Sequence, residues 1–318
     1  MIRWGIIGTG DVAERKGGPA LYQVERSSLV AVTNRTLARA EEFAKNHGDP
    51  KVHASAEELF ANPDVEAVYI ATPPDSHAEL TTLAAQAGKH VLCEKPMAMS
   101  VEEGNRMIAA CKDNNVSLTI AFYRREFPVV RKMKSMVESG AIGRPLSIFA
   151  QTYAQFSSHD SDPWRLNKDV SGGGFLMDMG THRFDLFTHF FGRPRQVSGY
   201  AANQSFTQPV DDAATVSLTY ADGVLGSASF HWNSPVERDT LTIVGSEGIL
   251  STDSLSGRGN LTLESKRGTE SWSLPSSTPV HLGLVEKIVM HLLDGGPNPC
   301  SGEDGIVATE IVSSVSFA

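Results

Sequence analysis

The sequence predicts an α/β protein in which a doubly wound parallel sheet is followed by an α+β domain built on one mostly antiparallel sheet. Three observations lead to this prediction. The chain has 318 residues, more than one ordinary core accommodates, so two domains are expected. Up to residue 122, short β-like runs alternate with helical patterns, as in a parallel sheet with helices on both faces. Beyond residue 122, β-like stretches follow one another with few helices between them.

The first part of the chain marks its elements with local patterns. Apolar runs predict strands at 2–7, 29–32, 65–71, 90–93 and 116–122. Helices are expected at 11–24, 37–46, 55–60, 76–87 and 100–114. The pairs Ser55 with Glu58 and Ser100 with Glu103 are capping boxes that open two of these helices. Gly17-Gly18-Pro19 should break or bend the helix at 11–24.

The second part reads as strands separated by turns. Strands are expected at 145–154, 196–202, 215–220, 224–232, 240–244 and 261–263. Helices are expected at 129–138, 177–191, 281–293 and from about Gly302 to the end of the chain. We therefore divide the sequence into a domain of residues 1–122 and a domain of residues 123–318.

Composition excludes several classes of partner. The formal net charge is -9, with 28 Lys+Arg against 37 Asp+Glu, and an acidic balance argues against binding to nucleic acid or anionic membranes. The three cysteines are odd in number and lack a CxxC pattern, so neither a disulfide framework nor a metal site is expected. No signal peptide or membrane-spanning stretch is visible, which favours a cytoplasmic protein.

A glycine-rich loop follows the first predicted strand. Gly8-Thr9-Gly10-Asp11-Val12-Ala13 matches the GxGxx[G/A] pattern of Rossmann domains and opens the first helix. Glycine lets the backbone approach a pyrophosphate, and the helix N-terminus supplies unpaired N–H groups. The alternative is a plain tight turn, but the position inside a strand–helix–strand unit at the start of the chain favours dinucleotide binding.

The end of the second strand bears on cofactor choice. NAD-selective sites usually place Asp or Glu there, but this chain has Asn34-Arg35. Arg35 could pair with a 2′-phosphate through its planar fork, although a solvated surface arginine is the plainer alternative. Taken with the missing acid, these residues favour NADP(H) over NAD(H).

Three further segments carry a family pattern. They are Ala71-Thr72-Pro73-Pro74-Asp75-Ser76-His77, then Ala87-Gly88-Lys89-His90-Val91-Leu92-Cys93-Glu94-Lys95-Pro96, then Gly172-Gly173-Gly174-Phe175-Leu176-Met177-Asp178-Met179-Gly180-Thr181-His182. In this order, behind the glycine loop, they resemble the glucose-fructose oxidoreductase/inositol dehydrogenase/rhizopine catabolism (Gfo/Idh/MocA) family. Gly140 to Pro145 and Trp164-Arg165 add to the resemblance, which spans nearly the whole chain.

The resemblance implies a Rossmann domain, a second domain with a large open-faced sheet, and oxidation or reduction of sugars, polyols and related hydroxy or keto compounds with NAD(P). It places Lys95, Asp178 and His182 in the active site. Thr72, Pro73 and His77 are expected to line the nicotinamide side of the cofactor, with Glu94 and Lys95 also at the cofactor. The Lys95-Pro96 bond is expected to be cis. A homodimer or homotetramer through the open sheet face is also implied.

The chemistry of these residues agrees with such a reaction. An unperturbed histidine has a pKa of about 6.5, so His182 can relay a proton at the reacting oxygen. Lys95 can hydrogen-bond that oxygen and stabilise developing alkoxide charge. Asp178 is four residues before His182, which places both on one face of a helix, where Asp178 can orient the imidazole or bind a substrate hydroxyl.

Other residues are candidates for contact with the substrate because aromatic faces pack on sugar rings and arginine binds hydroxyl or carboxylate groups. They are Tyr123, Arg124, Trp164 and Arg165. Each candidate residue also fits an ordinary structural role when taken alone, and the site rests on the motifs occurring together.

The sequence leaves other functions open. Some proteins of this kind use bound NAD to cleave glycosidic bonds, and others bind a dinucleotide to regulate transcription without turnover. Retention of Lys95, Asp178 and His182 favours an enzyme over a sensor. The identity of the substrate does not follow from the sequence, because loop residues set specificity.

Overall fold

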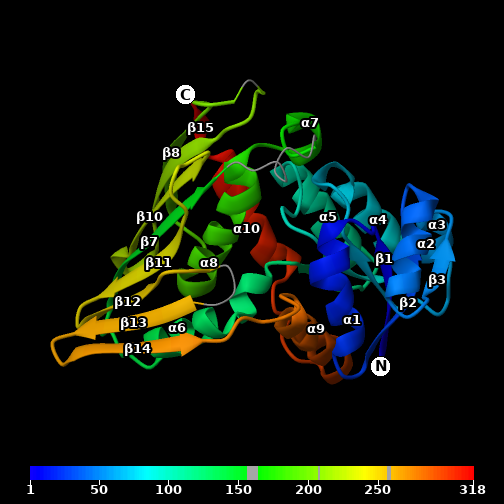
Figure 1. The fold of residues 1–318 in the computed structure, drawn as a ribbon, viewed down its shortest axis with the longest axis horizontal. Helices are drawn as coiled ribbons and strands as arrows, with labels where there is room; N and C mark the ends of the chain where they lie inside the picture. Colours follow the sequence, from blue (N-terminus) through cyan, green and yellow to red (C-terminus); the bar gives the residue numbers. More distant parts are fainter. Residues whose placement is uncertain (156–163, 207, 256–258) are drawn as a thin grey trace. The chain divides into compact units, whose positions relative to one another are not determined.

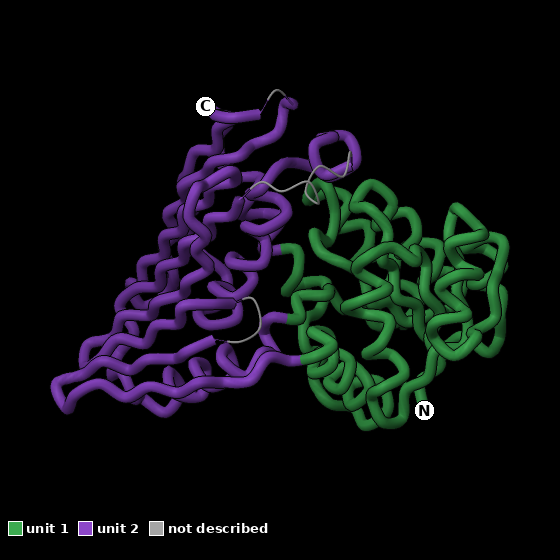
Figure 2. Tube along the Cα trace, viewed as in Figure 1, with its two compact units in different colours: residues 1–123, 278–306 green, residues 124–277, 307–318 purple. Residues whose placement is uncertain are grey.

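The computed structural model describes residues 1–155, 164–206, 208–255 and 259–318 (Figure 1). The described chain forms two compact units, coloured separately in Figure 2. Unit 1 contains Met1–Tyr123 and Thr278–Ile306, and unit 2 contains Arg124–Ser277 and Val307–Ala318.

Unit 1 is built on a parallel sheet whose strand order is β3-β2-β1-β4-β5-β6. The order reverses between β1 and β4, which is the arrangement of a doubly wound dinucleotide-binding fold. The strands are β1 (Ile2–Ile7), β2 (Ser27–Thr33), β3 (Lys51–His53), β4 (Ala67–Ile70), β5 (His90–Cys93) and β6 (Leu118–Ile120). The predicted parallel sheet is confirmed, and β3 is an additional short edge strand.

Helices pack around this sheet: α1 contacts α9, and α4 contacts both α3 and α5. They are α1 (Gly18–Gln23), α2 (Leu37–Asn46), α3 (Ala56–Phe60), α4 (His77–Gln86), α5 (Val101–Asp113) and α9 (Leu282–Asp294). The backbone N–H of Glu58 donates to Ser55 Oγ at 3.2 Å, and that of Glu103 donates to Ser100 Oγ at 3.2 Å. Both predicted helix starts are therefore confirmed.

The glycine pair in the first helix produces a π-turn, η1 (Ala13–Gly17), which leads directly into α1. A Cβ atom on Gly17 would lie 2.4 Å from the hydroxyl oxygen of Tyr69, and one on Gly18 would lie 2.4 Å from the carbonyl oxygen of Ala13. The expected disturbance of the helix is thus a widened turn that brings its backbone onto the ring of Tyr69.

The segment 278–306 returns to unit 1, whereas the sequence-based division assigned every residue after 122 to the second domain. Helix α9 packs against α1 and β1. The guanidinium of Arg26 donates to both carboxylate oxygens of Asp294 at 2.9 Å, and Asn298 Nδ2 donates to the carbonyl of Leu118 at 2.9 Å. The apolar face of α9 covers the Rossmann sheet, and this packing was not visible in the order of elements along the chain.

Unit 2 is built on a sheet with the order β14-β13-β12-β11-β7-β10-β9-β8-β15. Its pairings are antiparallel except β10 with β7 and β15 with β8, so the predicted mostly antiparallel sheet is confirmed. The strands are β7 (Pro145–Ala154), β8 (Gln196–Ala202), β9 (Ala213–Thr219), β10 (Leu225–Trp232), β11 (Arg238–Gly245), β12 (Gly248–Thr252), β13 (Gly259–Ser265), β14 (Gly268–Leu274) and β15 (Ser316–Phe317).

The helical segments of unit 2 position the second group of candidate residues. They are α6 (Pro128–Glu138), α7 (Lys168–Ser171), the π-turn η4 (Leu176–Gly180) and α8 (Thr181–Phe191). The short η3 (Tyr123–Glu126) joins the units, and α10 (Gly302–Ser313) runs from unit 1 into unit 2. The predicted last helix therefore stops before the end of the chain, where β15 begins.

Burial alternates along the central strands of this sheet. In β10, for example, Phe230 is fully buried whereas Leu225 is 56% exposed. Helices α6 and α8 lie against one face (Figure 1). Within the described ranges, no helix combines the length and the apolar character needed to cross a bilayer.

Candidate active site

The glycine loop lies at the carboxyl end of β1 and opens the first helix. Gly8 has φ +93°, a value that favours glycine, and its N–H donates to the carbonyl of Thr33 at 3.0 Å. A Cβ atom on Gly8 would lie 2.8 Å from the carbonyl oxygen of Ala71, so the loop fits tightly against the end of β4. Gly10 instead faces open space, since a Cβ atom there would meet nothing within 4 Å.

This arrangement fits the phosphates of a dinucleotide. The open side of Gly10 leaves room for a group to approach the backbone, and the N–H groups of Asp11 and Val12 belong to the first turn of the helix. Thr9 is held beside the end of β2, because Asn34 Nδ2 donates to Thr9 Oγ1 at 3.0 Å. Arg35 is exposed in the same loop. The structure therefore brings the predicted phosphate and ribose segments together at one edge of the sheet.

The loop after β4 carries Thr72 and Pro73, and His77 begins α4. His77 is completely buried, and its ring nitrogens lie 2.9 Å from the carbonyl oxygen of Pro96 and 3.0 Å from that of Thr72. Burial lowers the pKa of His77, and the two carbonyl groups partly offset this effect. His77 thus ties the loop after β4 to the loop after β5, while its contact with a cofactor stays a prediction.

The Glu94-Lys95-Pro96 segment follows β5, and the Lys95-Pro96 bond is cis, as expected. Glu94 is 5% exposed. Its Oε1 accepts a hydrogen bond from the Tyr69 hydroxyl at 2.6 Å and lies 2.9 Å from His281 Nε2. Its Oε2 accepts from the backbone N–H of Lys95 at 3.1 Å. Both carboxylate oxygens are therefore engaged inside unit 1.

The electrostatics of Glu94 follow from these contacts. Burial by itself would raise the pKa of the carboxyl group, but the hydrogen bond and charge of His281, followed by Tyr69 and Lys95, lower the pKa to about 2. Burial raises the pKa of Tyr69 well above its usual value, and the neighbouring Glu94 adds to the effect. Glu94 is thus an ionised acceptor, and Tyr69 is a neutral donor.

In unit 2, the glycine run positions the start of η4. Gly172 has φ +77° and ends α7, while a Cβ atom on Gly174 would lie 2.0 Å from the carbonyl oxygen of Asp211. The carboxylate of Asp211 accepts from the N–H groups of Gly174 at 2.9 Å and Leu176 at 2.6 Å. The glycines therefore let the buried Asp211 cap the segment that carries the predicted catalytic residues.

Asp178 and His182 lie on consecutive elements, Asp178 in η4 and His182 in α8. The side chain of Asp178 is 31% exposed, and Arg165 Nε lies 3.9 Å from Asp178 Oδ2. The guanidinium of Arg165 lies over the ring of Trp164, 4.4 Å from its centroid. The structure thus brings Trp164, Arg165 and Asp178 together, and His182 is buried at 1% exposure.

Two buried arginines fix α8. Arg125 Nε and Nη2 donate to Asp185 Oδ1 at 3.0 and 2.7 Å, and these side chains are 6% and 1% exposed. Arg183 is the residue after His182. It donates to Thr152 Oγ1 on β7 at 3.0 Å and pairs with Asp239 on β11. These contacts hold the start of α8, and with it His182, against the sheet and against η3.

Tyr123 and Arg124, two of the predicted substrate residues, have buried neighbours. The ring of Tyr123 lies 4.5 Å from that of His281, and the residue is 6% exposed. Arg124 Nη1 donates to the carbonyl of Leu255 at 2.6 Å and lies 3.5 Å from Asp239 Oδ2. Both residues thus take part in the packing of their own units, and their contact with a substrate stays a prediction.

The site predicted from the sequence does not include the residues that support it. These are Tyr69, Arg125, Asp185, Asp211, Asp239 and His281. Apart from Asp185, which lies three residues after His182, each of them is far along the chain from the motif that it serves, and no spacing links them. The available signal was a charged or polar side chain inside an apolar segment, as Asp185 is in α8.

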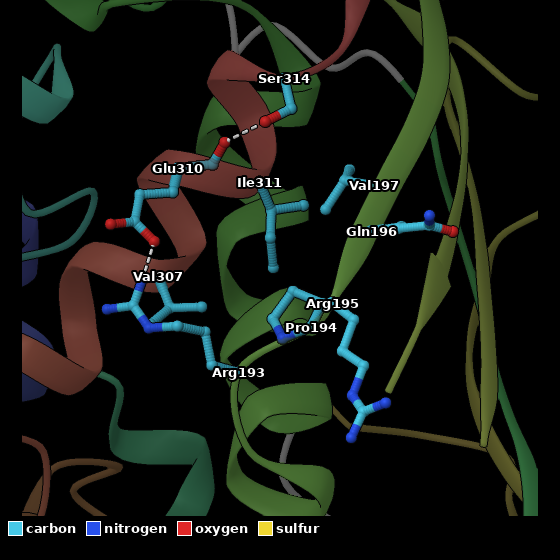
Figure 3. A pocket seen from close by; sticks show the side chains of 9 residues that line it. All are labelled: Arg193, Pro194, Arg195, Gln196, Val197, Val307, Glu310, Ile311 and Ser314. Carbon is cyan, nitrogen blue, oxygen red and sulfur yellow. Dashed lines mark hydrogen bonds and ion pairs between the residues drawn. The ribbon is translucent and has the colours of Figure 1, made fainter. Parts of the chain in front are cut away.

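A separate shallow cavity of about 250 Å³ lies in unit 2 between α10 and the start of β8 (Figure 3). Its apolar lining includes Val197, Val307 and Ile311, and Arg193 at its rim pairs with Glu310. The cavity contains none of the predicted site residues. The described residues also include no cluster of His, Cys, Asp or Glu arranged to hold a metal ion.

Comparison with known proteins decides the family. Residues 2–122 match the family described as "Oxidoreductase family, NAD-binding Rossmann fold", and residues 130–251 match the family described as "GFO/IDH/MocA C-terminal domain". An oxidoreductase of Formosa agariphila is 35% identical over 315 residues, which cover 98% of this chain and 97% of that protein. The chain belongs to the Gfo/Idh/MocA family of oxidoreductases.

Two other relatives of this Gfo/Idh/MocA protein bear on its chemistry and fold. The 1,5-anhydro-D-fructose reductase of Ensifer adhaerens is 29% identical over 96% of this chain and 92% of its own length. A 3-ketoreductase from Actinomadura kijaniata, solved with NADP and TDP-benzene, superposes with a TM-score of 0.87 at 24% identity over 100% of this chain and 99% of its own. The family resemblance read from the motifs is confirmed, and the chain is an oxidoreductase with an NAD(P)-binding Rossmann domain.

Proposed function

We propose that this oxidoreductase exchanges hydride between a nicotinamide cofactor and a sugar, a polyol or a related hydroxy or keto compound. One observation carries the proposal. In unit 1, the buried side chains of His77 and Glu94 hold the chain around Lys95, and the same unit contains a glycine loop whose open side fits a dinucleotide. When bound, nicotinamide would supply the two-electron chemistry at the substrate carbon. The protein has to bind, orient and handle the proton at the substrate oxygen.

Lys95 is proposed to act on the reacting oxygen. An ammonium group is a strong donor that stabilises negative charge as it develops on an alkoxide. This stabilisation requires the ammonium group to be held in a fixed position. Glu94 and His77 contact the main chain at Lys95 and Pro96 and so restrain the backbone that carries the lysine.

His182 is proposed as the proton relay in the same reaction, with Asp178 as its orienting or substrate-binding partner. The start of α8 is fixed through Arg183 and Asp185, which gives the imidazole a defined place. Trp164 and Arg165, grouped with Asp178, offer an aromatic face and a cation for binding hydroxyl groups. Tyr123 and Arg124 complete the proposed substrate contacts.

The proposed cofactor is NADP(H) in preference to NAD(H). Arg35 is exposed at the end of β2, where the chain carries Asn34 and Thr36 rather than a carboxylate. The bond between Asn34 and Thr9 holds that loop next to the glycine loop. Gly8, Gly10, Asp11, Val12, Thr72 and Pro73 are the further proposed cofactor contacts.

The experiment that tests the proposed roles compares turnover of the wild type with that of Lys95→Ala and His182→Ala. The assay follows NADPH absorbance with 1,5-anhydro-D-fructose and a panel of keto-sugars, and NADP⁺ reduction with sugars and polyols. Each variant is expected to lose at least about 100-fold in kcat, the effect of removing one acid–base or oxyanion group. Lys89→Ala is the matched control, because the ammonium group of Lys89 donates to the backbone carbonyls of Asn62 and Val65, away from the predicted site residues.

Full turnover in either variant would remove that residue from the mechanism. Co-purified NAD together with glycoside cleavage and no net cofactor turnover would replace the proposal by the hydrolase alternative. Binding of a dinucleotide without turnover of any substrate would favour the sensor alternative.

We also propose a homodimer or homotetramer, with the open face of the unit 2 sheet as the contact, in a cytoplasmic protein. Strands β7, β8, β9, β10 and β12 contain no Asp, Glu, Lys or Arg. The strand register places Phe149, Leu225 and Ile249 on one face, where they are 41%, 56% and 37% exposed. Across these five strands the face is uncharged, and an uncharged region with exposed apolar side chains is typical of a buried interface, whereas Arg238 on β11 and Glu264 on β13 are charged positions of the same face.

A further inference from the structure

We propose that His281 is a positioning residue for Lys95, acting through the Glu94 carboxylate together with Tyr69. The inference rests on the proposed role of Lys95 at the reacting oxygen. It concerns a residue in the segment that returns to unit 1 before α9, 187 positions from Glu94 in the sequence.

The directions of the hydrogen bonds at Glu94 follow from the chemistry of the groups. An ionised carboxylate only accepts, so the Tyr69 hydroxyl and His281 Nε2 both donate to Oε1, at 2.6 and 2.9 Å. His281 therefore carries a proton on Nε2. Its Nδ1 has no hydrogen-bond partner among the described residues, and the ring is completely buried. Within the described ranges, Glu94 is thus the one hydrogen-bond partner that orients this imidazole.

The other carboxylate oxygen reaches the main chain of Lys95. Glu94 Oε2 accepts from the Lys95 N–H at 3.1 Å, so a rotation of the carboxylate would move the backbone from which the lysine side chain starts. With Oε1 held by two donors, the plane of the carboxylate has little freedom. His281 and Tyr69 therefore act on the Lys95 backbone through the Glu94 carboxylate.

Further contacts make the support rigid on both sides. The ring of Tyr69 packs against Gly17, where a Cβ atom would lie 2.4 Å from its hydroxyl oxygen. The ring of Tyr123 lies 4.5 Å from that of His281. On the far side of Lys95, the His77 ring lies 2.9 Å from the carbonyl oxygen of Pro96. The loop that carries Lys95 is thus held before and after the lysine by buried side chains from separate elements.

The test compares Tyr69→Phe, His281→Leu and His281→Gln with the wild type. Tyr220→Phe is the matched control, because Tyr220 is also buried but its hydroxyl has no hydrogen-bond partner in the described part of the chain. Three quantities are measured. Hydrogen exchange at the Lys95 amide and the NADPH dissociation constant are measured on the protein without substrate. The kcat is measured with 1,5-anhydro-D-fructose or with the panel compound that is turned over.

Tyr69→Phe and His281→Leu should speed exchange at the Lys95 amide and lower kcat by roughly 10- to 100-fold, the range for a displaced catalytic group. The NADPH dissociation constant should change by less than about 3-fold, since the phosphate loop is untouched. His281→Gln should restore most of the protection of the Lys95 amide and most of kcat, because its amide can still donate to Glu94. Tyr220→Phe should behave as the wild type.

Unchanged exchange at the Lys95 amide in His281→Leu and Tyr69→Phe would overturn the inference, whatever the turnover. So would wild-type kcat in these variants while Lys95→Ala is inactive. An active Lys95→Ala would overturn the proposed role of Lys95 instead, and the exchange measurement would still report on the network. The two failures are thus distinguishable.

Discussion

At the scale of single residues, burial separates two ion pairs of nearly the same geometry. Arg125 and Asp185 in unit 2 make a forked contact with side chains 6% and 1% exposed. Arg26 and Asp294 in unit 1 also make a forked contact, with both side chains 47% exposed. A buried charge left without its partner is costly, whereas an exposed pair contributes little because water and salt screen it.

Asp185→Asn should therefore lower the free energy of unfolding by about 3 kcal/mol or more, since it removes the buried negative charge to which the Arg125 guanidinium donates. Asp294→Asn should lower it by less than about 1 kcal/mol. Urea unfolding of both variants beside the wild type measures the difference. Equal losses in the two variants would show that burial does not govern these pairs.

Glu94 links stability to pH. Its pKa is lowered from 4.5 to about 2, so its ionised form stabilises the fold above pH 4.5, and this contribution is lost as the pH falls from 4.5 towards 2. A shift of this size corresponds to about 3 kcal/mol at neutral pH. Glu94→Gln should lower the free energy of unfolding by up to about that amount at pH 7 and by progressively less below pH 4.5.

Urea unfolding from pH 7 to pH 3 measures this loss, with the exposed Glu79→Gln as control. A gap between Glu94→Gln and wild type that stays constant over this range would contradict the account of Glu94.

At the scale of elements, two glycines of the glycine loop meet different requirements: Gly8 is required by the fold, and Gly10 by the binding of a cofactor. Gly8 combines φ +93° with a close approach to the end of β4, whereas Gly10 has open space where a side chain would begin. The first position is needed by the turn itself. The second is needed only if another group comes close to the backbone.

Gly8→Ala should lower the stability of the protein without cofactor, because its Cβ atom would meet the carbonyl of Ala71 at 2.8 Å. Gly10→Ala should leave that stability within about 0.5 kcal/mol of wild type and weaken NADPH binding by at least about 10-fold. Thermal unfolding and fluorescence titration measure the two effects. Undiminished NADPH binding by Gly10→Ala would argue against the proposed phosphate position.

Elements whose signal is local were predictable from the sequence. The capping boxes at Ser55 and Ser100 gave correct helix starts, and the apolar runs gave β1, β4 and β5. Strand β14 was not predicted, because its segment Gly268–Leu274 is mostly exposed and polar and so lacks the alternation of apolar and polar residues that marks a strand. The site motifs were also local, but their supports were not. His281 reaches Glu94, and Asp239 reaches Arg183, only through the tertiary fold.

At the scale of the whole molecule, the chain completes its first unit with residues that come after β14, the eighth strand of the second sheet along the chain. Segment 278–306 supplies α9, the bond of Asn298 to Leu118 and the buried His281. Unit 1 therefore depends on both ends of the sequence, and a fragment that ends at residue 122 would lack the cover of α9 over α1 and β1.

The open sheet face predicts an assembly. Phe149→Lys with Leu225→Lys places charges on the face proposed to be buried between copies, so the double variant should become monomeric. Val236→Lys, at a 59% exposed apolar residue outside the strands, should leave the assembly unchanged. Sedimentation velocity reports the mass of each. A wild type that is already monomeric, or a double variant that keeps its mass, would contradict this use of the sheet.

The central claim is that this Gfo/Idh/MocA protein binds a nicotinamide dinucleotide at the glycine loop and turns it over. The most direct measurement is a fluorescence titration of the purified protein with NADPH and NADH, made on the wild type, on Arg35→Asp and on the exposed control Arg238→Asp. The wild type and the control should bind NADPH more tightly than NADH. Arg35→Asp should lose at least about 10-fold in NADPH affinity, as expected for one charge-assisted contact. Absence of binding to either nucleotide would contradict the central claim, and an unchanged preference in Arg35→Asp would contradict the role of Arg35.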